Sequence, residues 1–247
     1  MEIGSTVLDF DLLESTNKTM YELIQEGLVQ PGTVVRAGYQ TNGRGQRGTT
    51  WDSAASNNLL FSLYLDSRSI GPDEQFAISR GLSIAMCEAL QPLVGEAKLE
   101  IKWPNDILLD GRKLCGFLIE NSIKGNKLEW TIVGIGLNVN QVDFGKLKDA
   151  TSLSVQSGRN FDLDDLLGFC LEKLNVYWKR VQSFENLNDL YLSKLYGFSR
   201  SVPVVIDGES KEIQIQGVDA YGRLLGRVGE EERRFDLKEL RFSPIAP

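Results

Sequence analysis

A short glycine-rich segment carries the first side chains that could do chemistry. Gly43-Arg44-Gly45-Gln46-Arg47-Gly48 places the guanidinium groups of Arg44 and Arg47 on a backbone that its glycines allow to wrap closely around a ligand. Guanidinium groups bind carboxylates and phosphates well. The segment lies in the polar stretch 40–58, and a loop of this length inside a compact domain is usually functional or disordered. Composition alone leaves open a flexible, solvated basic loop.

The same segment formally matches the G-x-G-x-x-G fingerprint of dinucleotide-binding folds. That fingerprint requires a helix directly afterwards, whose N-terminus holds the pyrophosphate. Here Thr49-Thr50-Trp51-Asp52-Ser53 follows, and then a strand-like apolar stretch. The context therefore argues against a Rossmann fold.

A second cluster, Lys102-Trp103-Pro104-Asn105-Asp106, lies at the end of a predicted strand. Pro104 favours an extended Trp103 and ends the strand, so Asn105 and Asp106 fall where sites are often built. Asp106 could orient a basic group or help to hold a metal. The alternative is a plain strand terminator, with Trp103 in the core and two turn residues after it.

A third cluster, Arg112-Lys113-Leu114-Cys115-Gly116, follows the hairpin dipeptide Asp110-Gly111. A strand lysine that faces a pocket could bind a carboxylate or stabilise charge on a phosphate, although an exposed hairpin lysine is also common. Gly116 inside a strand indicates close approach of a ligand or of another backbone. Cys115 lies among apolar residues and is expected in the core rather than as a nucleophile.

The fourth cluster is Gly134-Ile135-Gly136-Leu137-Asn138-Val139-Asn140. Alternating glycines in a strand let another group pack closely on one face, and the asparagines supply polar groups at its end. A β-bulge is the alternative.

Composition limits the chemistry. The 247 residues contain no histidine, which excludes Ser-His-Asp and Cys-His catalysis and the usual zinc sites. The three cysteines form no C-x-x-C pair, so a disulfide framework is not expected and a cytoplasmic location fits best. The net charge of -7 argues against nucleic acid as a partner. Neither a signal peptide nor a membrane-spanning apolar run is found, so no membrane partner is expected.

The expected elements position these clusters at strand ends and in one long loop. Apolar periodicity predicts helices at 18–28, 73–93 and 163–181, with N-cap candidates at residues 15–17. Strands are predicted at 6–13, 33–37, 58–65, 98–103, 107–109, 113–120 and 127–135. Short strands at 202–206, 212–218, 223–228 and 233–237 predict a small C-terminal β-barrel.

In chain order, the clusters resemble the motifs of the biotin protein ligases. The matching segments are Ser15-Thr16-Asn17, the Gly43–Gly48 loop ending at Trp51, and the clusters that begin at Lys102, Arg112 and Gly134. The resemblance is close over about residues 5–145. It implies an α/β (α+β) catalytic domain, residues 1–198, of the class shared with class II aminoacyl-tRNA synthetases. An SH3-like domain would span 199–247.

The resemblance also implies a reaction in two steps. Biotin and ATP would form biotinyl-5′-AMP, and a lysine of the biotin carboxyl carrier protein of a carboxylase would then receive the biotin. Arg44, Lys113 and Mg²⁺ would neutralise charge as the carboxylate meets the triphosphate, with no protein ligand assigned to the metal.

The resemblance assigns residues to each substrate. Biotin would be bound by Ser15, Thr16, Asn17, Gln40, Gly43, Arg44, Gly45, Gln46, Lys113 and Gly116. ATP or the adenylate would be bound by Arg47, Trp51, Asn105, Asp106 and Asn138.

Two departures from the family pattern matter. Many members have arginine where this chain has Gln46, which puts retention of the acyl-adenylate in doubt. Larger members also carry an N-terminal DNA-binding domain, and because the first motif begins at Ser15 we expect a monofunctional ligase. The sequence does not decide between a monomer and a homodimer.

Two other functions remain as alternatives. The first is a lipoate or octanoate protein ligase on a related fold. The second is a non-catalytic small-molecule-binding module.

Overall fold

A mixed seven-stranded sheet forms the main layer in the computed structural model, which describes residues 2–237 and 239–243, apart from the side chain of Arg47. The strand order is β1-β2-β3-β7-β6-β5-β4. β1 and β2 run parallel, and every other neighbouring pair is antiparallel. The strands are β1 (Thr6–Leu13), β2 (Thr33–Gln40), β3 (Leu59–Asp66), β4 (Leu99–Lys102), β5 (Asp106–Leu109), β6 (Arg112–Lys124) and β7 (Lys127–Leu137).

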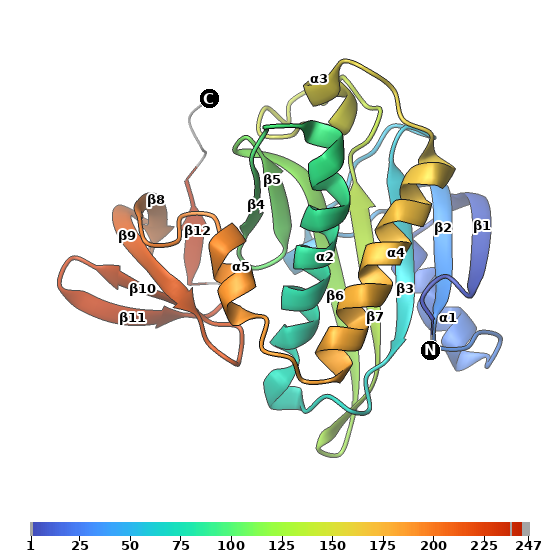
Figure 1. Ribbon diagram of the computed structural model, residues 1–247, viewed down its shortest axis with the longest axis horizontal. Coiled ribbons are helices and arrows are strands. Elements are labelled where there is room, and N and C mark those ends of the chain that lie inside the picture. Colours follow the sequence, from blue (N-terminus) through green and yellow to red (C-terminus); the bar gives the residue numbers. More distant parts are fainter. Residues whose placement is uncertain (1, 238, 244–247) are drawn as a thin grey trace.

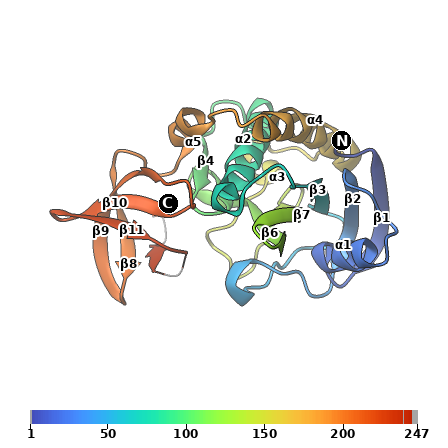
Figure 2. The ribbon, with the colours of Figure 1, turned by 90° about the horizontal axis from the view of Figure 1, so that it is seen from below.

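Helices cover both faces of this sheet (Figure 1). α2 (Phe76–Val94) and α4 (Leu163–Gln182) lie side by side on one face, and α1 (Thr16–Gln25) lies on the other (Figure 2). α2 is apolar nearly all round because it contacts both the sheet and α4, and its buried residues join the main core. In the described part of the chain, no helix is long and apolar enough to cross a membrane.

The predicted hairpin at Asp110-Gly111 is confirmed. Both residues have positive φ, 46° and 79°, as a two-residue type I′ turn requires. The turn joins β5 to β6, and a register shift between Ile107 and Leu108 sets Asp106 opposite Gly116. The second and third clusters of the sequence therefore lie on adjacent strands.

The C-terminal part of the chain forms a five-stranded antiparallel sheet beside the β4 edge of the main sheet (Figure 1). Its order is β11-β10-β9-β8-β12, and it confirms the predicted C-terminal strands. The strands are β8 (Ser201–Ile206), β9 (Glu209–Val218), β10 (Leu224–Val228), β11 (Glu231–Phe235) and β12 (Leu240–Phe242). β12 was not predicted, because three residues give no usable alternation; it pairs with β8.

The helices differ from expectation in extent and number. α1 begins at Thr16, directly after Ser15 in the N-cap position, so Asn17 belongs to the helix rather than to its cap. α1 also ends before 28, because Gly27 follows its C-cap with φ 69°. Two short helices, α3 (Leu153–Ser157) and α5 (Asn188–Lys194), were not predicted because so few residues show no clear periodicity.

Cys115 is a core residue, as predicted. Its thiol is free and buried, and burial raises the pKa of the Cys115 thiol well above its ordinary value. Such a thiol stays protonated near neutral pH, so Cys115 is unsuited to act as a nucleophile.

Candidate functional site

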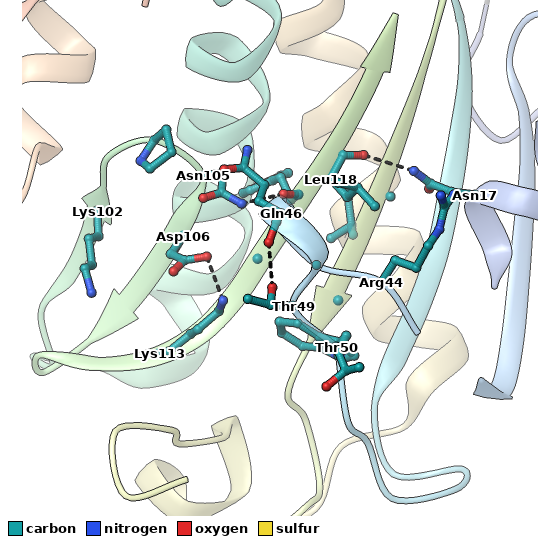
Figure 3. Close-up of a pocket in the computed structure, with 18 of the residues that line it drawn as sticks. Asn17, Arg44, Gln46, Thr49, Thr50, Lys102, Asn105, Asp106, Lys113 and Leu118 are labelled. Atoms are coloured by element: carbon teal, nitrogen blue, oxygen red, sulfur yellow. Dashed lines mark hydrogen bonds and ion pairs between the residues drawn. The ribbon is translucent and has the colours of Figure 1, made fainter. Parts of the chain in front are cut away.

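The polar clusters of the sequence meet in one cavity at the N-terminal end of α1 (Figure 3). The cavity has a volume of about 360 Å³. Most residues predicted for the site line it: Ser15, Thr16, Asn17, Gln40, Arg44, Gly45, Gln46, Trp51, Asn105, Asp106, Lys113 and Gly116. Gly43 and Asn138 are not among the lining residues, and the side chain of Arg47 lies outside the described part of the chain.

One end of the cavity is built from uncharged polar groups. The backbone N–H of Thr16 donates to Oε1 of Gln40 at 2.7 Å, and the Thr16 hydroxyl lies 3.1 Å from the same oxygen. Ser62 Oγ lies 2.8 Å from Thr16 Oγ1 and 2.6 Å from Asn17 Oδ1. Because Ser62, Thr16 and Asn17 are buried, these hydrogen bonds fix the side chains for a neutral, polar ligand group.

Glu120 connects this polar end to the glycine loop. Its Oε2 accepts a hydrogen bond from Asn17 Nδ2 at 2.7 Å and lies 3.3 Å from Nη2 of Arg44. Asn17 Nδ2 also donates to the carbonyl of Leu118 at 3.2 Å (Figure 3). No motif in the sequence indicates a role for Glu120 or Ser62, because each looks like an ordinary strand residue.

The glycine loop is closed at its base by backbone hydrogen bonds. Trp51 N–H donates to the carbonyl of Gly43 at 2.9 Å, and Gly45 N–H donates to that of Thr49 at 2.7 Å. A Cβ on Gly43 would lie 2.5 Å from the Trp51 carbonyl oxygen, so only glycine fits there. Gly43 thus shapes the loop without lining the cavity, whereas Arg44, Gly45 and Gln46 face it.

Trp51 explains the glycines of β6 and β7. A Cβ on Gly136 would lie 2.4 Å from Cε2 of the indole, and one on Gly116 would lie 3.0 Å from Cζ3. A Cβ on Gly134 would lie 2.3 Å from Oδ1 of Asn17. The prediction that these glycines allow close packing is confirmed, and β7 pairs with β3 and β6 without a bulge at these positions.

A lysine–aspartate pair lies at the other end of the cavity. Lys113 Nζ lies 2.8 Å from Asp106 Oδ1 and 5.2 Å from the centroid of the Trp51 ring (Figure 3). The Lys113 side chain is 38% exposed, so a ligand can reach its ammonium group. Asn105 secures the neighbouring turn by donating from Nδ2 to the carbonyl of Phe117 at 2.6 Å.

A second cavity, of about 480 Å³, adjoins this cationic end and shares part of its lining. It is bordered by Lys102, Lys113 and Arg241, with the carboxylates of Asp106 and Asp149. Burial lowers the pKa of the Lys102 ammonium, which Asp106 partly offsets. An excess of cations beside a sheltered cavity suits a polyanion.

β12 supplies the residues that sequence reasoning missed at this end. Leu240, Arg241 and Phe242 line the main cavity, and Lys102 Nζ lies 5.5 Å from the centroid of the Phe242 ring. Nothing in the short segment 240–242 indicates a site, because only the fold of the C-terminal sheet brings it there.

Asn138 lies away from the cavity. It is 5% exposed, and its Nδ2 donates to the carbonyl of Thr151 at 3.0 Å. Thr151 in turn donates its backbone N–H to the carbonyl of Lys113 at 2.9 Å. In this structure Asn138 supports the strand that carries Lys113.

The part of the chain described here holds no cluster of acidic or cysteine side chains placed to bind a metal ion.

Comparison with known proteins gives a consistent set of relatives. The model of the biotin/lipoate A/B protein ligase family matches residues 10–138. The chain is 36% identical to the bifunctional ligase/repressor BirA of Bacillus subtilis over 181 residues, which are 69% of this chain and 54% of that protein. The biotin--[acetyl-CoA-carboxylase] ligase of Mycobacterium tuberculosis is 27% identical over 236 residues, covering 92% of this chain and 86% of that protein. The chain thus spans about half the length of the Bacillus relative.

Among solved structures, the chain is similar to the biotin protein ligase from Aquifex aeolicus in complex with biotin and ATP. The TM-score is 0.79 at 27% identity, covering 97% of this chain and 100% of that one. The mixed α/β fold with its second antiparallel sheet therefore matches that of a biotin ligase along almost the whole chain.

Proposed function

The chain belongs to the biotin/lipoate A/B protein ligase family, and we propose that it activates biotin with ATP and transfers it to a lysine of a biotin carboxyl carrier domain. The observation that carries this proposal is the division of one cavity into a neutral polar end and a cationic end. Biotin has a neutral ureido ring and a carboxylate, and ATP brings the polyphosphate.

Biotin fits the polar end through its ring. The hydroxyl and amide groups of Ser15, Thr16, Asn17 and Gln40 can donate to and accept from a ureido group, which has both kinds of hydrogen-bonding atom. The carboxylate tail would then extend beneath the glycine loop toward Arg44. Gly45 and Gln46 would lie over it, and Gly116 would form the floor.

In the first step, a carboxylate oxygen of biotin attacks the α-phosphorus of ATP. A bond forms between that oxygen and phosphorus, the bond to the bridging oxygen breaks, and pyrophosphate leaves. The barrier comes largely from bringing two anions together, so Arg44 and Lys113 would stabilise the negative charge. Lys102 and Arg241, at the second cavity, would hold the departing phosphates.

Magnesium would arrive with ATP and neutralise its phosphates. The carboxylates of Asp106 and Asp149 border the second cavity and are oxygen donors of the kind that Mg²⁺ prefers. Trp51 and Asn105 would contact the nucleotide. Arg47, from its position in the motif, would also bind ATP or the adenylate. Asn138 would contribute indirectly, because it bonds to Thr151 and so supports the strand that carries Lys113.

In the second step, the neutral amine of the acceptor lysine attacks the acyl carbon of biotinyl-5′-AMP. An amide bond forms, the bond between the acyl carbon and the phosphate oxygen breaks, and AMP leaves while the amine loses a proton. The glycine loop, closed over the mixed anhydride, would limit its hydrolysis by water.

We further propose that the two sheets belong to the two domains expected at 1–198 and 199–247. The second domain would be SH3-like.

The carrier domain provides the test of this second step. Purified carrier domain, biotin and MgATP should give a carrier heavier by one biotin, by intact-protein mass spectrometry, and a carrier whose acceptor lysine is replaced by arginine should remain unmodified. An unmodified wild-type carrier would contradict the transfer step.

Lipoate is the second candidate acid, since the family includes lipoate ligases. The hydrogen-bonded polar end argues against it, because the dithiolane ring of lipoate has no donor to offer to Thr16 or Asn17.

A further inference from the structure

A buried hydrogen bond joins the C-terminal sheet to the second cluster of the cavity. Trp103 Nε1 donates to the carbonyl of Gly222 at 2.8 Å, across 119 residues of sequence. Trp103 is 3% exposed, so neither partner can exchange this bond for one to water. The contact is therefore a fixed attachment between the two sheets.

The turn that carries Gly222 is itself rigid. Asp219 Oδ1 accepts from the backbone N–H groups of Tyr221 and Arg223 at 3.0 and 2.9 Å, and Asp219 Oδ2 lies 2.8 Å from Arg223 Nε. Gly222 has φ 87°, and a Cβ there would lie 2.7 Å from Cδ2 of Phe76. The turn thus holds the Gly222 carbonyl at one place against Phe76 and Trp103.

Trp103 is followed within three residues by Asn105, which lines the main cavity, and by Asp106, which lines both cavities. Asn105 is held against β6 by two hydrogen bonds with Phe117, at 2.6 and 2.9 Å. Asp106 then meets Lys113 at 2.8 Å. A shift of Trp103 would pass along this short segment to the aspartate–lysine pair.

The two sheets stay joined even without the indole bond. Arg200, directly before β8, has its Nη2 2.8 Å from Oε1 of Glu100, a buried residue of β4, and Lys102 Nζ lies 5.5 Å from the centroid of the Phe242 ring in β12. Loss of the Trp103 bond therefore loosens the cluster at residues 102–106 without detaching the C-terminal sheet.

We propose that Trp103 is a positioning residue, through which the turn 219–223 of the C-terminal sheet holds Asn105 and Asp106 in place at the nucleotide end of the cavity. The attachment stands on the contacts alone, whereas its effect on ATP rests on the proposed function. The C-terminal sheet thereby sets the geometry of a site that its strand β12 also borders directly.

Two variants test the attachment, with a matched control. Trp103→Phe removes the donor, and Asp219→Ala removes the cap of the turn and leaves every residue of both cavities unchanged. Asp162→Ala is the control, because Asp162 caps α4 in the same way, accepting from Asp164 N–H at 2.8 Å and Asp165 N–H at 3.0 Å. Amide hydrogen exchange of peptides covering 103–109 is measured without ligands.

We expect exchange at 103–109 to speed up about fivefold in Asp219→Ala, as for loss of one buried hydrogen bond, and not in Asp162→Ala. In wild-type and variant enzymes, KM for ATP should then rise about fivefold in Asp219→Ala while KM for biotin stays within about twofold. Unchanged exchange in Asp219→Ala, or an equal increase in the control, would overturn the attachment. If exchange rises but KM for ATP does not, the positioning role is wrong.

The ligand-free measurement separates this inference from the proposed function. Faster exchange at 103–109 would support the attachment even if the wild-type chain proved inactive with biotin. If Trp103→Phe fails to fold, Asp219→Ala carries the test, since its side chain lies outside the core.

Discussion

Nζ of Lys113 lies 2.8 Å from Oδ1 of Asp106, on two strands joined by the Asp110-Gly111 turn. Both side chains border both cavities, so the pair lies where the proposed carboxylate and the phosphates would meet. The Lys113 side chain is 38% exposed and that of Asp106 is 20% exposed. An incoming anion can therefore reach the ammonium group and compete with Asp106 for it.

Lys113→Ala should abolish most of the adenylation activity. Removing one preorganised cation from the developing negative charge should slow biotinyl-5′-AMP formation about 100- to 1,000-fold. Circular dichroism should show an unchanged fold, and Lys124→Ala, at an exposed lysine far along β6, should keep wild-type turnover. Equal rates for Lys113→Ala and wild type would mean that the site is misplaced.

Gly136→Ala should disturb the cavity through Trp51. The new methyl group would meet the indole at 2.4 Å and push the base of the glycine loop outward, at a cost of about 1–3 kcal/mol. Gly168→Ala in α4 is the matched control, since nothing lies within 4 Å of its Cβ and alanine favours a helix. Urea unfolding and nucleotide titration measure both effects. Similar stability and affinity in the two variants would contradict the packing of Trp51 on β7.

The sequence predicts contacts between residues that are close along the chain. It does not predict which residues distant in sequence join the site. Asp110-Gly111 identified the hairpin, because a type I′ turn pairs Leu109 with Arg112. The register shift between Ile107 and Leu108, which sets Asp106 opposite Gly116, has no such local signal in the sequence. Glu120 and Arg241 could not be found in this way. Their place at the site depends on the path of β6 and on the docking of the C-terminal sheet, and neither leaves a local pattern in the sequence.

Burial also separates residues that the motifs group together. Asn138 comes two residues after Gly136, yet it is 5% exposed and its Nδ2 donates to the carbonyl of Thr151. A position at the end of a strand does not indicate how deeply a side chain is buried. Sequence alone therefore does not show whether Asn138 contacts a ligand or supports Lys113.

Gln46→Arg should slow the escape of biotinyl-5′-AMP. Gln46 lines the cavity, and its backbone carbonyl accepts hydrogen bonds from the hydroxyl and the N–H of Thr49. A guanidinium group there could form a charge-assisted bond to the acyl phosphate and slow release about tenfold. Gln46→Met, of similar size and without charge, is the control. Release rates come from a trap assay with preformed adenylate, and identical rates for Gln46→Arg and wild type would make this position neutral.

The pH dependence of ATP binding should show the contribution of the Lys102 charge to ATP affinity. Burial lowers the pKa of this ammonium, so it loses its proton at a lower pH than an exposed lysine does. The charged form exists below the pKa, so the ATP affinity that it supplies should decline as pH rises through that value. Lys102→Arg stays charged and should keep its affinity at higher pH. Parallel pH profiles for KM of ATP in the two proteins would exclude a role for the Lys102 charge.

Isotope exchange between pyrophosphate and ATP measures activation of the acid itself, with the carboxylic acid as the only variable. Exchange should depend on biotin, fall to background without it, and be lost in Lys113→Ala. Exchange supported by lipoate and not by biotin would contradict the proposed activation of biotin.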